Sequence, residues 1–228
     1  MASQRDSAPQ HTEQVRIMLR PIGSGLPLGF FAFGIGMLLL GCSALGWIPV
    51  AEQKDVGTFL FLFVFPLELL ATVFAFLARD TLGATTLGLF TASWLALGWF
   101  EFTSPPGSTS VTVGIYLFGF ATAALLLALM STMGKPFFTL LLLLAVARMV
   151  LSGYYDVGGS HRWYEISGGF AIALSALAMY GAAALGIEDA QQRDVLPLFR
   201  RGGADEAFQG YGAQLERLEA EPGVRQQL

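Results

Sequence analysis

The chain has 228 residues, of which 54% are hydrophobic and only 13% are charged, and its formal net charge is −4. A soluble domain usually carries about 25% charged residues, so this composition excludes an ordinary soluble globule. The charges gather at the two ends of the chain, and no basic patch indicates a nucleic-acid partner. A single cysteine excludes a disulfide framework within the chain. The composition therefore predicts an integral membrane protein.

Three regions follow from the distribution of polar residues. Residues 1–23 form a polar N-terminal segment, residues 24–187 a membrane domain, and residues 188–228 a charged C-terminal tail. Within the membrane domain, each apolar stretch is long enough to cross about 30 Å of hydrocarbon as a helix. The six predicted spans are 26–48, 56–78, 81–102, 111–133, 137–155 and 166–187. We therefore expect an all-α membrane protein with six transmembrane helices.

The basic residues predict the orientation of these spans. An even number of spans places both termini on one side of the membrane. That side is flanked by Arg5, Arg16, Arg20, Arg79, Lys135, Arg193, Arg200 and Arg201, and the other side only by Lys54 and Arg162. The positive-inside rule then places both termini in the cytoplasm. The chain contains no asparagine and so no N-glycosylation site, which fits a multi-pass protein of a bacterial inner (plasma) membrane.

Two charged residues fall inside predicted spans. Glu68 lies about midway along the second span, and Arg148 lies past the middle of the fifth. A charge at this depth costs about 2.5–3.5 kcal/mol on insertion scales, so each residue needs a partner, a cavity or water. One interpretation is that one or both line a pathway for an anion or a proton. The other is that they form a buried ion pair that ties two helices together.

The sequence contains none of the motifs that usually indicate an enzyme active site. No His, Cys and carboxylate cluster has the spacing of metal ligands, and no G-x-S-x-G motif is present. Gly134-Lys135 is followed by Pro136, which predicts a turn rather than a phosphate-binding loop. We therefore expect neither an enzyme nor a metal or other cofactor.

The start of the first span has an unusual composition. Pro27 is tolerated there because the first turn of a helix leaves its N–H groups unpaired. The small residues Gly25 and Gly29 recur at helical spacing and favour the close approach of another helix. That helix can belong to the same chain or to a neighbouring subunit, and both alternatives stay open.

The same stretch resembles a known family signature. Pro27-Leu28-Gly29-Phe30-Phe31-Ala32-Phe33-Gly34 is similar to the motif that opens the first span of the acetate uptake transporter family, which includes the succinate–acetate permease and the YaaH-like proteins. The resemblance extends over residues 24–200. Its other parts are Arg79-Asp80, Gly114-Ile115-Tyr116-Leu117 and Arg193-Asp194-Val195-Leu196-Pro197-Leu198.

The resemblance implies a function and an assembly. Members of this family pass small carboxylates, chiefly acetate and sometimes succinate, often coupled to protons, and form ring-like homo-hexamers with a pathway through each subunit. The residues that match the family's apolar constriction by position are Phe33, Trp94 and Leu143. Those that match its entrance motif are Pro27, Leu28 and Gly29. The expected function is thus a carboxylate transporter or anion channel.

Departures from the family pattern keep two alternatives open. Ser24-Gly25-Leu26 replaces the family's Asn-Pro-Ala, Trp94 replaces a Tyr, and Glu68 stands where relatives carry Gln. Arg148 has no counterpart in the pattern. A buried carboxylate favours the passage of ammonium or another small solute through the same scaffold. Loss of the motif's polar amide favours a membrane protein that no longer transports and whose tail serves as a docking segment.

Overall fold

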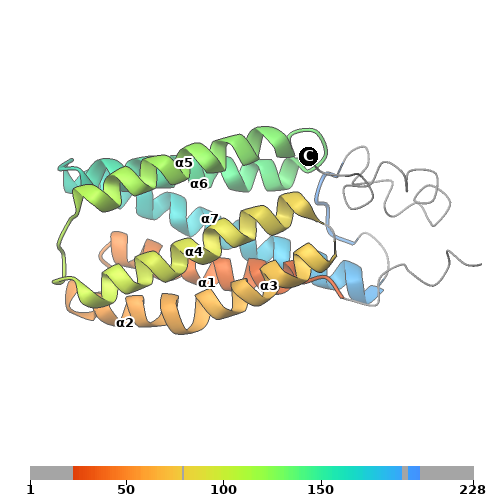
Figure 1. Ribbon diagram of the computed structural model, residues 1–228, viewed down its shortest axis with the longest axis horizontal. Coiled ribbons are helices and arrows are strands. Elements are labelled where there is room, and N and C mark those ends of the chain that lie inside the picture. Colours follow the sequence, from red (N-terminus) through yellow and green to blue (C-terminus); the bar gives the residue numbers. More distant parts are fainter. Residues whose placement is uncertain (1–22, 79, 192–194, 201–228) are drawn as a thin grey trace, which may run out of the picture.

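The computed structural model describes residues 23–78, 80–191 and 195–200, and every regular element among them is a helix. The predicted N-terminal segment therefore lies almost wholly outside the described residues, as does the tail beyond residue 200. Along the chain the elements are α1 (Leu26–Ala44), η2 (Val50–Glu52), α2 (Gln53–Phe59), η3 (Leu60–Val64), α3 (Phe65–Leu77), α4 (Thr81–Thr103), α5 (Val111–Ser131), α6 (Pro136–Asp156) and α7 (His161–Gln191). Because α2, η3 and α3 run on without a break, six long helical segments result (Figure 1).

Five of these segments in the described part of the chain are long and apolar enough to cross a membrane: α1, Val50–Leu77, α5, α6 and α7. The sixth, α4, has 23 residues and is long enough, but its threonines and glycines make it more polar. The predicted all-helical membrane fold is confirmed at this level. The last helix differs from the prediction, because it begins at His161 and absorbs residues expected in a loop.

The second segment contains a turn of π-helix at Leu60–Val64, directly before Pro66. The N–H of Phe65 donates to the carbonyl of Leu60, five residues back. Proline has no N–H to donate and its ring crowds the preceding turn, so a local change of helical pitch is a common response. The π-helical turn shifts the phase of the helix, and both Val56 before it and Glu68 after it face the core.

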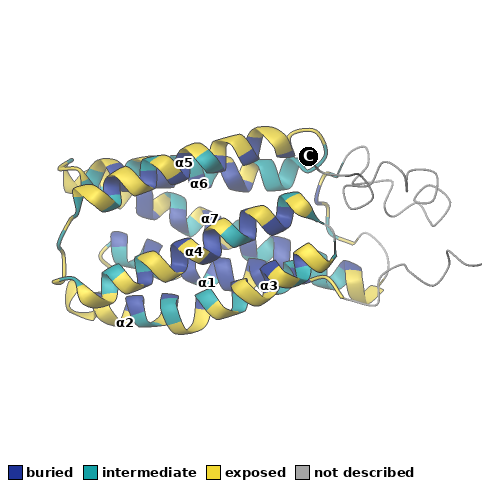
Figure 2. Ribbon diagram, in the orientation of Figure 1, coloured by how far each residue is buried: buried dark blue, intermediate teal, exposed yellow. Residues whose placement is uncertain are grey.

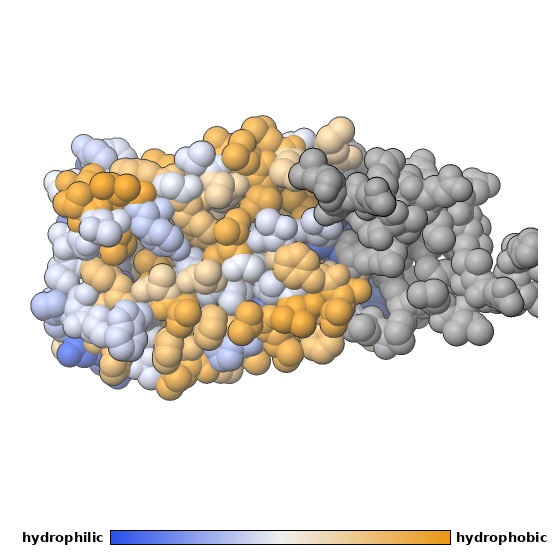
Figure 3. Space-filling view, viewed as in Figure 1, coloured by the Kyte–Doolittle hydropathy of each residue, from blue (hydrophilic) through white to orange (hydrophobic). Residues whose placement is uncertain are grey.

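The six segments enclose one core. Going round the bundle, α1 packs on α3, α3 on α4, α5 on α6, α6 on α7, and α7 back on α1, whereas α4 and α5 contact each other much less. Buried positions point inward on every segment and exposed positions outward (Figure 2). The outer surface seen in Figure 3 is hydrophobic over α3 and much of α5. An apolar outer surface of this kind is what contact with lipid requires.

Both described ends of the chain lie at the same end of the bundle (Figure 1). An ion pair of 2.8 Å between Lys135 and Asp80 joins two of the connections at that end. The segment after α7 folds back across it, since the Tyr180 hydroxyl donates to the carbonyl of Pro197 at 3.0 Å. We call this the terminal end, and the opposite one, near Glu101 and Asp156, the far end.

Small residues bring helices into close contact within the chain. A Cβ atom added at Gly25 would lie 2.9 Å from the carbonyl oxygen of Ala71, and one at Gly29 would lie 3.1 Å from the Cβ of Ala71. The Gly25 and Gly29 pair thus packs against α3 of the same chain. Gly186, by contrast, has no atom within 4 Å of the position its Cβ would take.

Candidate functional site

Four buried aromatic side chains meet at the centre of the bundle, and we call them the aromatic cluster: Phe33 from α1, Phe90 and Trp94 from α4, and Phe120 from α5. The ring of Phe33 lies 5.1 Å from that of Phe90 and 5.8 Å from that of Trp94, both edge to face. Phe90 in turn lies 5.0 Å from Phe120. Such edge-to-face pairs add about 0.5–1.5 kcal/mol each to the burial of the rings.

Local sequence explains why these rings can meet. Phe90 and Trp94 are four residues apart and so share one face of α4. The indole of Trp94 lies over Gly36, where an added Cβ would come within 2.9 Å of the ring. Glycine at this position of α1 therefore makes the space that the Trp94 ring fills.

A small cavity adjoins the aromatic cluster, and we call it the inner cavity. Its volume is about 10 Å³, which is room for about one water molecule. The lining residues are Met37, Phe90, Ser93, Trp94, Leu97, Leu117, Phe120, Arg148 and Met149. Arg148 is the only charged residue among them.

Arg148 is almost completely enclosed, with 7% of its surface exposed, and its Nε has no hydrogen-bond partner. The groups that act electrostatically on its guanidinium are Tyr164, Glu101 and Asp156, all at the far end. Both carboxylates have other partners as well. Glu101 accepts a hydrogen bond from the Gln53 side chain, and Asp156 accepts one from the N–H of Ser110 at 3.3 Å.

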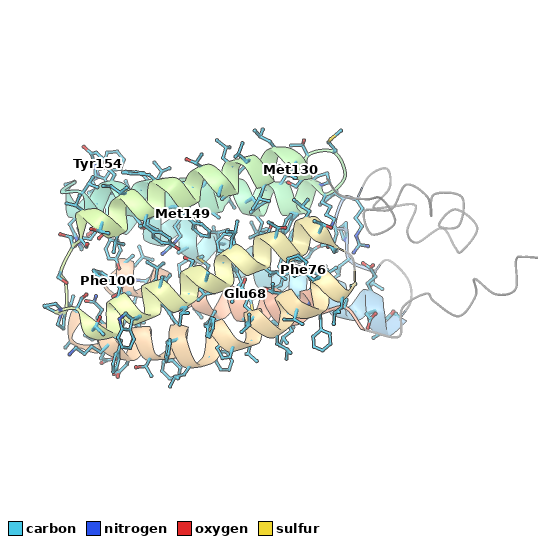
Figure 4. The ribbon with its side chains drawn as sticks, in the orientation of Figure 1. Glu68, Phe76, Phe100, Met130, Met149 and Tyr154 are labelled. Atoms are coloured by element: carbon cyan, nitrogen blue, oxygen red, sulfur yellow. The ribbon has the colours of Figure 1, made fainter. Side chains whose placement is uncertain are left out.

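Glu68 is fully buried, and neither of its carboxyl oxygens makes a hydrogen bond. The indole N–H of Trp94 faces this carboxyl group, but the contact falls short of hydrogen-bond geometry at both atoms. In Figure 4, Glu68 lies toward Phe76, whereas Met149, the neighbour of Arg148, lies toward Tyr154. Among the described residues, no ion pair joins Glu68 to Arg148. Glu68 and Arg148 thus lie apart from each other. Trp94 lies near both, because its N–H faces Glu68 and its side chain lines the inner cavity together with Arg148.

A second cavity, the end cavity, opens at the terminal end with a volume of about 100 Å³. It is lined by Leu26, Phe30, Asp80, Gly83, Lys135, Phe137, Phe138, Leu185, Leu198 and Arg200. Its cations are held by acidic partners, Lys135 by Asp80 at 2.8 Å and Arg200 by Glu188 at 2.6 Å. One face of α1 connects the two cavities, because Phe30 lines the end cavity, Phe33 belongs to the aromatic cluster, and Met37 lines the inner cavity.

The structure brings together two of the three residues named for the constriction. Phe33 and Trp94 contact each other, but Leu143 lies on the outer face of α6 with 46% of its surface exposed. The uniform leucine run hides the register of α6, whose inward positions include Leu142, Ala145 and Met149. Of the entrance motif, Gly29 is buried, whereas Pro27 and Leu28 are half-buried at the start of α1.

Sequence reasoning missed Phe90 and Phe120. Phe90 was detectable, since Leu87, Phe90 and Trp94 follow a helical repeat and all three are buried. Phe120 carried no comparable signal, because aromatic residues stand on several faces of α5 and only the packing selects one of them.

The membrane helices form a bundle whose interior is closed by the aromatic cluster, with a cavity on either side of that cluster. This is the architecture of a polytopic membrane protein with a narrow interior. The chain belongs to the GPR1/FUN34/yaaH family, whose sequence model matches residues 8–197. This confirms the resemblance that the first span suggested.

Individual relatives agree with this assignment. Acetate permease A of Emericella nidulans is 28% identical to the chain over 193 residues, which cover 75% of this chain and 63% of the permease. The chain therefore spans less than two thirds of that relative's length. The structure of the bacterial acetate channel SatP matches with a TM-score of 0.70 at 17% identity, over 78% of this chain and 99% of that one. At this identity the match shows a shared fold.

Proposed function

We propose that this protein is a membrane transporter or channel for small carboxylates, with acetate as the first candidate and succinate as the second. The observation that carries the proposal is the face of α1 formed by Phe30, Phe33 and Met37, which runs from the end cavity through the aromatic cluster to the inner cavity. The family and the acetate permease relative support the substrate class.

In this proposal the permeant passes through the interior of each subunit. Pro27, Leu28 and Gly29 shape its entrance at the terminal end, and Phe33 and Trp94 belong to its constriction, with Phe90 and Phe120 in the place expected for Leu143. An apolar constriction of this kind restricts passage because water is excluded from it and an ion must give up its hydration shell to enter. Arg148 at the inner cavity favours an anion over a cation such as ammonium.

Glu68 makes proton coupling part of the proposal. A carboxyl group buried without a hydrogen-bond partner beside the constriction can hold a proton that accompanies the anion. Proton coupling is a separate part of the proposal, because a passive channel would need no buried carboxyl group.

We also propose that the protein forms a ring-like homo-hexamer in the inner (plasma) membrane, with both termini in the cytoplasm. The apolar outer surface supports a membrane location, and the basic residues that flank one side of the predicted spans in the sequence support the orientation. The resemblance to the family supports the hexamer. The mass of the purified protein, measured by native mass spectrometry with lipid and detergent removed, should be six times 24.5 kDa. A single-chain mass under conditions that keep the protein folded would contradict the hexamer.

The transport proposal is tested with purified protein in liposomes. Labelled acetate should enter these liposomes faster than protein-free ones, and unlabelled acetate should compete more strongly than ammonium chloride. The same vesicles are then tested with labelled succinate. No acetate flux above protein-free liposomes, with or without a pH gradient, would overturn the proposal and favour a non-transporting protein.

A further inference from the structure

Residues 195–200, which come shortly after α7, lie across the terminal end of the bundle (Figure 1), and we call them the strap. Leu198 is only 9% exposed, whereas the residues on either side of it are exposed. The Leu198 side chain lines the end cavity together with Phe30 and Leu185. The strap therefore supplies part of the wall of this cavity from outside the helical bundle.

Two polar contacts hold the strap on α7. The Tyr180 hydroxyl donates to the carbonyl of Pro197 at 3.0 Å. Arg200 donates to the carboxylate of Glu188 at 2.6 Å. The two α7 residues are eight positions apart, about 12 Å along a helix, and their partners are three positions apart, about 10 Å in an extended chain. The strap is therefore stretched along α7, with Leu198 between its two points of attachment.

The backbone of Phe199 opposes this placement of the strap. Its φ of 54° lies in the left-handed region, and among the described residues it is the only one other than glycine with a positive φ. A bulky side chain disfavours this conformation, so Phe199 adopts it because the contacts of Leu198 and Arg200 on either side hold it there. Release of the strap also returns the charges of Arg200 and Glu188 to water, which offsets the loss of their ion pair. The strap is thus held in a position from which it can be released.

The cavity beneath the strap belongs to the proposed pathway. The end cavity, of about 100 Å³, is lined by Phe30, and the same face of α1 continues through Phe33 to the inner cavity. We propose that the strap is a gate at this mouth of the pathway. While the strap is bound to α7, Leu198 narrows the end cavity, and its release opens the cavity and raises the flux. The effect on flux rests on the proposed transport function, whereas the effect on access to the cavity does not.

Access to the end cavity can be measured through a cysteine placed in its wall. In a Cys42→Ala background, Leu185→Cys puts a single thiol there. The purified full chain in detergent is treated with a small water-soluble methanethiosulfonate, and the rate of modification is followed by mass spectrometry. Leu198→Ala should raise this rate at least fivefold, because the side chain that narrows the cavity is removed. An unchanged rate would overturn the gate.

Tyr180→Phe tests release of the strap without changing the wall of the cavity. This substitution removes the hydroxyl that binds Pro197 and keeps the aromatic ring, and Tyr180 does not line the end cavity. The rate at the Leu185→Cys thiol should rise at least twofold. Val195→Ala, at an exposed position of the strap, is the matched control and should leave the rate unchanged. Equal rates in Tyr180→Phe and the parent protein would contradict release of the strap, even if Leu198→Ala fails to fold.

Loosening of the whole bundle is measured separately at the native Cys42, near the opposite end of α1. The rate of its modification should be the same with and without Leu198→Ala, and a parallel rise at Cys42 would contradict a local gate. In proteoliposomes, labelled acetate should enter at least twofold faster with Leu198→Ala. Flux in the parent protein without a rise in the variant would overturn the gate. Absence of flux in both proteins would instead contradict the proposed function and leave the access measurement to decide whether the strap closes the cavity.

Discussion

At the level of single residues, the interior of this protein is closed by ring contacts rather than by polar groups. Phe33 occupies the central place, because it contacts both Phe90 and Trp94 and comes from a different helix. Each ring is held by the others, so the narrowest part of the proposed pathway has a definite shape. The size of the Phe33 side chain should therefore decide which carboxylates pass.

Replacement of Phe33 by Ala should widen the constriction. We expect uptake of propionate and butyrate by proteoliposomes to rise severalfold relative to acetate, since the removed ring leaves space between α1 and α4. Phe31→Ala is the matched control, because Phe31 stands on the same helix with 44% of its surface exposed. Equal carboxylate selectivity in the Phe33 variant and the parent protein would remove Phe33 from the constriction.

Replacement of Glu68 by Gln should separate proton coupling from passage. Gln has nearly the same shape but cannot bind a proton in this way, so an acid-outside pH gradient should no longer accelerate acetate uptake, while uptake down an acetate gradient should persist. Glu52→Gln, at an exposed position, should retain the response to the pH gradient. If the Glu68 variant responds to the gradient as the parent protein does, Glu68 is not the coupling group.

At the level of elements, the second segment and α4 are in unusually close contact. A Cβ atom at Gly57 would lie 2.6 Å from the backbone N of Phe102 and 2.7 Å from the carbonyl oxygen of Gly98. Backbone atoms cannot rotate aside as a flexible side chain can, so any added atom must push the two helices apart. Close packing at Gly57 also holds Gln53 near Glu101 at the far end.

Gly57→Ala should therefore destabilise the bundle, by about 1–3 kcal/mol in the free energy of unfolding. Thermal unfolding in detergent, followed by circular dichroism, should show a lower midpoint. Gly119→Ala is the control, because Gly119 is also helical but has no atom within 4 Å of its Cβ position. A midpoint for Gly57→Ala equal to or above that of Gly119→Ala would contradict the steric argument.

At the level of the whole molecule, the two cavities differ in size and in depth. The end cavity opens among Lys135, Asp80 and Arg200, whereas the inner cavity is far smaller and lies deeper in the bundle. The positive-inside rule predicts that the terminal end faces the cytoplasm. The larger cavity would then receive the anion from, or release it to, the cytoplasm.

This orientation can be tested by labelling cysteines from outside the cell. In a Cys42→Ala background, which removes the one native thiol, Thr109→Cys should react with a membrane-impermeant maleimide on intact cells. Ser24→Cys, exposed at the terminal end, should react only after permeabilisation. The reverse labelling pattern would show that the termini face outward.

Composition and periodicity were sufficient for the helical membrane fold, because an apolar stretch of about 20 residues has few other stable states in a bilayer. Composition also named Glu68 and Arg148, whose charges are conspicuous in such helices, whereas Phe33 and Trp94 were named through the resemblance to the family. The π-helical turn before Pro66 was not predicted, since several local responses to a proline are possible.

The sequence by itself therefore determined the class of fold, the family and most of the chemically distinctive residues, since these depend on local composition and on motifs. Only the tertiary structure decided which side chains meet. It placed Leu143 on the outer face, put Phe90 and Phe120 beside Phe33, and separated Glu68 from Arg148. The physical reason is that the rotation of each helix about its axis is set by packing against its neighbours, and in a uniformly apolar helix such as α6 the local sequence carries little of that information.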